Sequence, residues 1–216
     1  MSNINSVDKF FNKYPIKRFR HKEIVKRSDE DFKYVYFLKK GYVKMYSVSV
    51  NGNELSLNIF KPGSYFPILW AMGELADEYN YEAITSAEIR LVPKKEFIEF
   101  IKKDPAILFD LTCRLTAGFG SLLKRMEVLF FGSARNRVAL ALVVAAKRFG
   151  KENSRGEIRI SVPITHKDIA ALAGLTRETT SLEMKRFCEE GVIARRGRKN
   201  IVVVDMSKLV RLANYC

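Results

Sequence analysis

Residues 34–66 alternate apolar and polar side chains with the two-residue period of β-strands. Three glycine-containing pairs interrupt this alternation as turn signals, namely Lys40-Gly41, Asn51-Gly52 and Pro62-Gly63. The Asn-Gly pair lies between two strand-like runs, 46–50 and 54–60, and is the strongest local hairpin signal in the chain. A further strand pattern begins at Ala87. Many short strands at regular spacing predict a β-sandwich or small barrel over residues 1–104.

The hydrophobic period changes at Asp104-Pro105, where an N-cap residue precedes a proline suited to the first helical position. Leucines then recur every seven residues, and other apolar residues widen their stripe; the set is Leu108, Leu111, Leu115, Phe119, Leu122, Met126 and Leu129. This repeat predicts a long helix over 105–132 that packs along the same helix of a second copy. The alternative is a helix buried against its own domain.

The pattern breaks again at 131–133, which we interpret as a hinge, and Ser133 is placed to cap the next helix. A strand follows at 157–162, and residues 192–204 read as a hairpin. A short terminal helix is expected after Asp205 or Ser207. The chain therefore divides into three predicted parts: 1–104, the helix and hinge at 105–132, and 133–216.

Within the last part, two short helical patterns meet at Gly174, which can adopt the positive φ of a tight turn. Thr165 is placed to cap the first helix, with Asp168 as its capping-box partner. Thr176 is placed to cap the second, which is expected to run to about Glu190. Two helices joined by a glycine turn form a helix-turn-helix pattern.

The second helix opens with Arg177, Glu178 and Thr179, three side chains suited to reading DNA. In a helix-turn-helix, the N-terminal turn of the second helix enters the major groove. There a guanidinium donates two hydrogen bonds to guanine, and a carboxylate accepts one from cytosine N4. A hydroxyl suits a phosphate oxygen or a base edge. The alternative is a solvated first turn that carries an Arg–Glu pair.

The stretch "ITHKDIAALAGLTRETTS…EEGVI…IVVVD" resembles the winged helix-turn-helix of the CRP/FNR superfamily of bacterial transcription regulators. The upstream order also resembles that family, and the likeness covers nearly the whole chain. It implies an α+β protein made of an antiparallel β-roll (a cupin-like sandwich), a long dimerisation helix and a C-terminal winged helix-turn-helix. It also implies a homodimer that binds palindromic double-stranded DNA, often under effector control, with RNA polymerase as a further partner.

The resemblance also implies which residues contact DNA. The expected base contacts are Arg177, Glu178, Ser181 and Leu182. The expected phosphate contacts are Thr165, His166, Lys167, Thr176, Thr179, Arg195, Arg196, Arg198 and Lys199. Many family members have an arginine where this chain has Leu182, which cannot make that contact but suits a thymine methyl. The resemblance therefore implies the mode of DNA binding but leaves the half-site sequence open.

The charge distribution agrees with a polyanion partner. The chain has a formal net charge of +14. Residues 131–216 carry 17 Lys/Arg against 8 Asp/Glu, a net charge of +9 in 86 residues. A basic module is the electrostatic footprint of a nucleic-acid binder, although a lysine-rich solvated surface gives similar totals.

The effector-binding features of cyclic-nucleotide-binding relatives are not matched in this chain. Where they carry a glutamate for the ribose and an arginine for the phosphate, it has Pro67, Ile68 and Tyr81. A buried cyclic phosphate would then lack a compensating cation, so we expect neither cAMP nor cGMP as cofactor. An aromatic-rich segment offers another candidate pocket, consisting of Tyr65, Phe66, Ile68, Trp70 and Tyr81. The alternative is that these side chains simply form the core of the roll.

Other classes of protein are disfavoured. Three scattered cysteines without a CxxC pair argue against a disulfide framework or a metal–thiolate site. The polar N-terminus and the short apolar runs lead us to expect a cytoplasmic protein without a membrane span. No catalytic or metal-ligand spacing is present, so we expect no enzyme. The remaining alternative is a ligand sensor that signals through protein–protein contacts.

Overall fold

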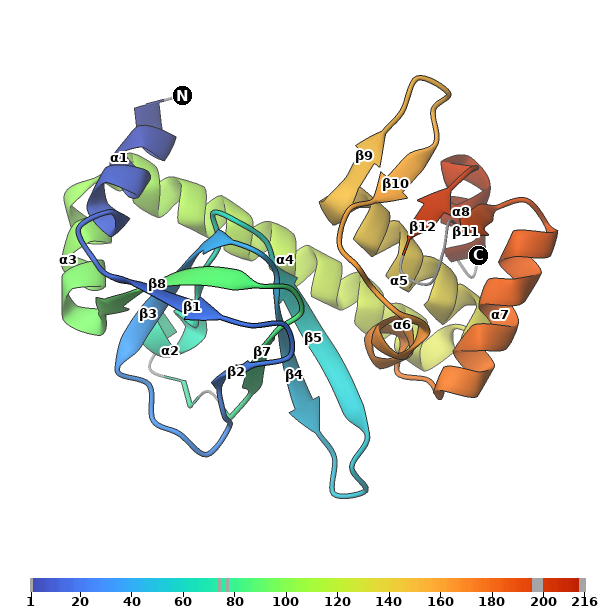
Figure 1. Ribbon diagram of the computed structural model, residues 1–216, viewed down its shortest axis with the longest axis horizontal. Helices are drawn as coiled ribbons and strands as arrows, with labels where there is room; N and C mark the ends of the chain where they lie inside the picture. Colours follow the sequence, from blue (N-terminus) through green and yellow to red (C-terminus); the bar gives the residue numbers. More distant parts are fainter. Residues whose placement is uncertain (1, 74, 77, 196–199, 214–216) are drawn as a thin grey trace. The chain divides into compact units, whose positions relative to one another are not determined.

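Two four-stranded antiparallel sheets, ordered β1-β8-β3-β6 and β2-β7-β4-β5, form most of the first half of the chain (Figure 1). Their strands are β1 (Ile16–Phe19), β2 (Ile24–Lys26), β3 (Tyr34–Lys40), β4 (Val43–Val48), β5 (Glu54–Phe60), β6 (Tyr65–Phe66), β7 (Asn80–Ala83) and β8 (Ala87–Pro93). This arrangement confirms the predicted antiparallel β-roll.

The computed structural model describes residues 2–73, 75–76, 78–195 and 200–213, with side chains described from Val7 onward. It contains two compact units, Met1–Gly118 and Phe119–Cys216. The division between them falls inside the long helix α4 (Pro105–Phe131).

The β4–β5 hairpin forms where the Asn-Gly pair predicted it. Val48 pairs with Glu54, and the amide of Ser49 donates to the carbonyl of Asn53 at 2.9 Å. Gly52 has φ +77°, a left-handed conformation that glycine adopts without a Cβ clash. Gly41 (φ +87°) and Gly63 (φ +84°) are left-handed as well, so all three turn signals are confirmed.

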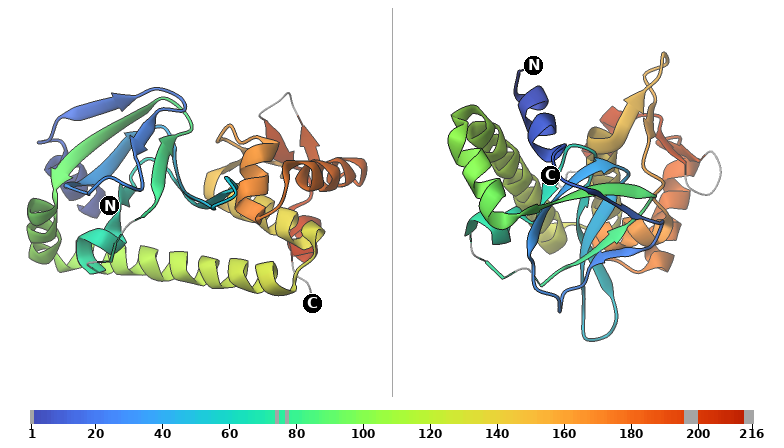
Figure 2. Two further views of the ribbon diagram at one scale, coloured as in Figure 1. Left: turned by 90° about the horizontal axis from the view of Figure 1, so that it is seen from below. Right: turned by 60° about the vertical axis from the view of Figure 1, so that its left-hand side comes forward.

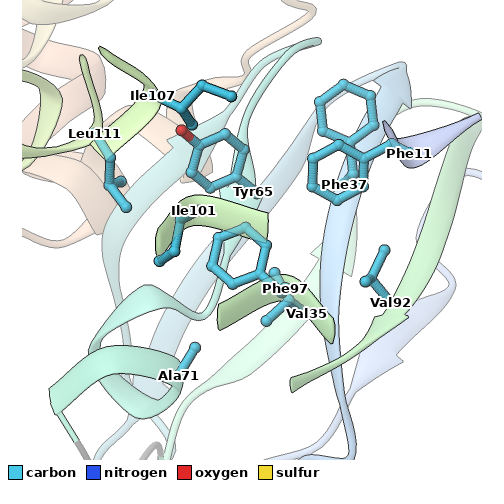
Figure 3. Packing of buried hydrophobic residues seen from close by; sticks show 10 residues of the cluster. All are labelled: Phe11, Val35, Phe37, Tyr65, Ala71, Val92, Phe97, Ile101, Ile107 and Leu111. Atoms are coloured by element: carbon cyan, nitrogen blue, oxygen red, sulfur yellow. The ribbon is translucent and has the colours of Figure 1, made fainter. Parts of the chain in front are cut away.

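The roll has two hydrophobic core clusters, and successive strand residues enter different ones because side chains alternate across a strand. Tyr65 joins the cluster in Figure 3, whereas its neighbour Phe66 joins the other. Phe11 of helix α1 (Ser2–Phe11) is fully buried and stacks on Phe37, with ring centroids 4.2 Å apart. Burying a phenylalanine contributes about 1.5–3 kcal/mol. The sequence pattern did not predict α1 or the short helix α2 (Ile68–Gly73).

Helix α3 (Lys94–Lys103) leads into α4 (Pro105–Phe131), a single uninterrupted helix (Figure 2). Asp104 caps α4 as predicted, since its Oδ1 accepts the amide hydrogen of Ala106 at 3.0 Å. Leu111 was predicted to lie in a dimer interface, and this was wrong. It is 2% exposed and packs in the core of its own roll beside Ile107 and Tyr65 (Figure 3).

The second unit consists of the end of α4 and a helical domain with one antiparallel sheet, ordered β11-β12-β10-β9. Its elements are α5 (Ala134–Phe149), β9 (Gly150–Glu152), β10 (Ile158–Ile160), α6 (His166–Ala173), α7 (Arg177–Glu189), β11 (Ile193–Arg195), β12 (Ile201–Val203) and α8 (Met206–Ala213). The predicted caps are confirmed at both ends of this domain: Ser133 forms a capping box with Asn136, and Asp205 Oδ1 accepts from the amide of Lys208 at 2.8 Å.

Candidate nucleic-acid interface

Helices α6 and α7 form the predicted helix-turn-helix. At the start of α6, Asp168 Oδ2 accepts hydrogen bonds from the amide and the hydroxyl of Thr165, each at 2.7 Å. The helix ends at Gly174, whose φ and ψ of 63° and 42° are left-handed and whose amide donates to the carbonyl of Ala170. A non-glycine residue in this conformation would cost about 1–2 kcal/mol. Local side-chain chemistry therefore fixes both ends of α6.

The start of α7 is held by a threonine cap. Thr176 Oγ1 accepts from the amide of Thr179 at 3.2 Å and lies 3.0 Å from the Thr179 hydroxyl. The remaining amides of the first turn have no partner within the helix, so this end attracts anions such as phosphate. Both threonines were predicted phosphate contacts, and the structure places their hydroxyls together at this end.

Helix α7 separates an inner face from an outer face. Thr180, Met184 and Phe187 are buried, at the spacing of one helical face. Arg177 and Glu178 are exposed in the first turn, and Leu182 is 51% exposed one turn later. The predicted base-contact residues thus share the outer face, with Ser181 half-buried at its edge.

His166 lies differently from the prediction. Its Nδ1 is 2.8 Å from Ser181 Oγ, and its Nε2 is buried without a hydrogen-bond partner among the described residues. Neither ring nitrogen is therefore presented to a phosphate, so the geometry of the side chain does not support the predicted phosphate contact. Burial lowers the pKa of His166, and the charges of Arg195 and Arg177 lower it further.

The other predicted phosphate contacts fall into two groups. Lys167 and Arg195 are exposed, and Thr165 is half-buried because its hydroxyl serves the α6 cap. Arg196, Arg198 and Lys199 of the predicted wing lie outside the described residues. The strands that flank them, β11 and β12, pair antiparallel from Ile193–Val203 to Arg195–Ile201, which confirms the two strands of the predicted hairpin.

A charge cluster that the sequence did not single out lies behind the outer face of α7. Glu183 is 5% exposed, and its Oε1 accepts from Arg186 Nη1 at 2.6 Å. Arg135 of α5 contacts both Glu183 and Glu190, while Lys208 of α8 contacts Glu190. The one sequence signal was a glutamate at a position where α7 turns its apolar residues inward.

The rest of the predicted dimer interface forms an exposed seam on α4. Five of its side chains lie outside both core clusters and are 37–60% exposed, namely Leu108, Leu115, Phe119, Leu122 and Met126. Leu129 is half-buried. Leu111 points into the core, so Thr112 takes its place in the seam. The seam positions 108, 112, 115, 119, 122, 126 and 129 then alternate spacings of four and three residues. This is the a/d pattern of a coiled coil.

Helix α4 is also long and apolar enough to cross a membrane, judged by length and composition alone, with an 18-residue window of mean hydropathy 1.3. The short apolar runs of the sequence had led us to expect no such helix. One helix of this kind is weak evidence for a span. Charged side chains also line the helix in intrahelical pairs, Arg114 with Asp110 and Lys124 with Glu127. The seven-residue seam favours a helix–helix contact.

The candidate effector residues are divided between the two core clusters of the roll. Phe66 and Tyr81 stack on each other in one core cluster, with centroids 5.2 Å apart, whereas Tyr65, Ile68 and Trp70 pack in or against the other. The alternative that these residues form the core of the roll therefore describes them better. A buried cation that the sequence did not single out lies nearby: Lys26 is 2% exposed, with Nζ 4.0 Å from the Phe32 ring centroid.

Comparisons with known proteins agree with this architecture. Residues 16–104 match a cyclic nucleotide-binding domain and residues 136–212 a Crp-like helix-turn-helix domain. The transcriptional regulator SdrP of Thermus thermophilus is 30% identical over 178 residues, covering 82% of this chain and 83% of that protein. The nitrogen fixation regulation protein FixK of Azorhizobium caulinodans is also 30% identical, over 82% of this chain and 71% of its own length.

Solved structures give the same result. A CRP/FNR family regulator from Thermus thermophilus superposes with a TM-score of 0.69 at 26% identity, covering 92% of this chain and 98% of that one. A mutant of CooA from Carboxydothermus hydrogenoformans reaches a TM-score of 0.79 at 23% identity, covering 95% and 90%. With the capped helix-turn-helix and the β-roll in place, this chain belongs to the CRP/FNR family of DNA-binding transcription regulators.

Proposed function

We propose that this regulator is a homodimer that binds a two-fold symmetric DNA site by placing α7 of each copy in successive major grooves. The observation that carries the proposal is the exposed first turn of α7, where Arg177 and Glu178 stand beside an amide-rich helix end capped by Thr176. A guanidinium and a carboxylate at that position can read a G and a C edge, respectively.

The dimer is supported by the seam on α4. Leu108, Leu115 and Leu122 recur at heptad spacing and are exposed, while the apolar residues needed by each core are buried elsewhere. Exposed apolar rows of this length mark interaction surfaces. A symmetric partner covers such a row with the same row of the second copy, which matches a palindromic DNA site.

The remaining partners follow from the same proposal. We infer that this regulator acts in the cytoplasm on DNA, with RNA polymerase as its further partner. Its effector, if it responds to one, is a small molecule other than cAMP or cGMP. The support is Tyr81, which is 1% exposed and packed between aromatic rings at the position where the resemblance expects a phosphate-binding arginine.

Selection of bound duplexes from a random pool tests the proposal directly. We expect an enriched two-fold repeat whose half-sites lie about one helical turn apart, roughly 10–10.5 bp. Affinity is expected to fall steeply with salt, because lysines and arginines displace counterions from phosphates. Sedimentation should give twice the chain mass. Selection without any enriched palindrome, or a protein that stays monomeric at micromolar concentration, would refute it.

A further inference from the structure

The first turn of α5 contacts the far end of the DNA-reading helix. Arg135 Nη2 donates to both carboxylate oxygens of Glu190, at 2.6 and 2.7 Å, directly after α7 ends. The guanidinium carbon of Arg135 also lies 5.0 Å from the centroid of Phe187, a buried residue of α7. One side chain of α5 therefore holds α7 by a charge-assisted hydrogen bond and a cation–π contact.

Glu183 strengthens this attachment. Its Oε2 lies 3.7 Å from Arg135 Nη1, and its Oε1 accepts from Arg186. A buried carboxylate needs compensating cations, because its desolvation is costly. On the other side, Lys208 Nζ donates to the carbonyl of Glu190 at 3.2 Å. The hydrogen bond from Arg135 lowers the pKa of Glu190.

The same turn of α5 also holds the end of the α4 helix. Arg137 donates from Nη2 to the carbonyl of Leu129 at 2.7 Å and from Nε to the carbonyl of Gly132 at 3.2 Å. These carbonyls belong to the last turn of α4 and to the break that follows it, where a cation is favourable. Arg135 and Arg137, two residues apart, thus join the end of α4 and the end of α7 through one helical turn.

We propose that Arg135 is a positioning residue for DNA recognition: it fixes the angle at which α7 leaves the α4–α5 junction. This inference rests on the proposed function, in which two copies present their α7 helices to one operator. The spacing and tilt of the two helix tips then depend on how rigidly each α7 is tied to its own α4. Without the Arg135 contacts, α7 stays folded but its orientation relative to α4 is no longer fixed.

The test compares two full-length variants that lose the same charge, Arg135→Met and Arg211→Met. Arg211 is exposed on α8. Affinity is measured at fixed salt for the selected operator, for random duplex, and for an operator with one base pair inserted between the half-sites. One base pair rotates a half-site by roughly 35°. Circular dichroism and the Tm report folding.

For Arg135→Met we expect operator affinity to fall about ten- to hundredfold, the range of one to two mismatched base pairs. Random-duplex affinity should match that of Arg211→Met, and the penalty for the inserted base pair should shrink. Arg135→Lys, which keeps the charge but not the guanidinium geometry, should lie between. Glu190→Gln should repeat the loss more weakly, and it serves where Arg135→Met does not fold.

Three outcomes would overturn the inference. One is an equal loss of operator and random-duplex affinity in a folded Arg135→Met protein, which would make Arg135 a general electrostatic contributor to DNA binding. Another is an Arg135→Met protein whose affinities for all three duplexes equal those of Arg211→Met. The third is an unchanged penalty for the inserted base pair in both Arg135→Met and Glu190→Gln. If the unmodified protein prefers no palindrome, the proposed function fails and this inference fails with it; if it does prefer one, these outcomes concern Arg135 alone.

Discussion

His166 Nδ1, at the first residue of α6, lies 2.8 Å from Ser181 Oγ, in the second turn of α7. This contact joins the two helices of the helix-turn-helix at a point away from Gly174, the turn that connects them in the chain. Because Nε2 is buried as well, the imidazole is packed between the two helices and is not free to bind phosphate. Burial and two nearby arginines favour its neutral form.

We therefore expect His166 to titrate below 6.5, its usual pKa in an unfolded chain. The chain has only two histidines, so an NMR titration of the imidazole protons is readily assigned with a His21→Asn variant. A group whose pKa is lowered by folding contributes stability above 6.5 that is lost as the pH falls through its folded pKa. The Tm should therefore fall as the pH is lowered from 7.5 to 5, and this fall should be smaller in His166→Asn. A pKa of His166 above 6.5 would contradict its buried position between α6 and α7.

The exposed first turn of α7 gives a second prediction. Arg177→Ala and Glu178→Ala should each weaken operator binding by about 1–3 kcal/mol, the cost of one lost base contact. Each should relax base preference at one position per half-site, as measured by selection from a random pool. Because both side chains are exposed, the Tm should stay within the small range typical of surface substitutions.

Arg155→Ala is the charge-matched control for Arg177→Ala, since Arg155 is exposed in the β9–β10 hairpin of the same domain. It should lower the affinity for all duplexes slightly and leave base preference intact. If Arg177→Ala behaved in the same way, Arg177 would be a phosphate contact and not a base reader.

The helix-turn-helix could be predicted from sequence because its determinants are local. Thr165 with Asp168, Gly174, and Thr176 with Thr179 all act within three or four residues of the helix ends they define. Capping chemistry and left-handed turns depend on neighbours in the chain, so their residue types are readable without a fold. Exposure of Arg177 followed from the same helical phase.

Contacts between distant residues were not readable. Leu111 fits the apolar stripe of α4, and only the presence of the roll explains why it turns inward beside Tyr65. Arg135 and Glu190 are 55 residues apart, and ordinary charged residues at such a separation carry no pairing signal. His166 was assigned to phosphate from the family resemblance, which does not reveal the direction of its ring.

Leu111 and Leu115 give a matched test of the two faces of α4. Leu111→Ala should lower the free energy of unfolding by about 2–5 kcal/mol, because it leaves a cavity in a packed core. Leu115→Ala removes the same atoms from the exposed seam and should instead raise the dimer dissociation constant. Chemical denaturation and analytical ultracentrifugation separate the two effects. Similar effects of both substitutions on dimerisation would place Leu111 in the seam after all.

Leu182 is the expected DNA contact at which this chain departs from the family resemblance, and it carries a prediction about operator sequence. It is 51% exposed, one helical turn beyond Glu178 on the outer face of α7. An aliphatic group there favours a thymine methyl and cannot donate to guanine. Leu182→Arg should therefore change the preferred base at one position of each half-site from T to G, with a gain of about 1–3 kcal/mol for the new site. Leu182→Ala is the control, because it shortens the side chain without adding a donor and should only weaken the preference for T. Parallel selections with the three proteins measure this directly, and an unchanged consensus in Leu182→Arg would remove Leu182 from the base-reading surface.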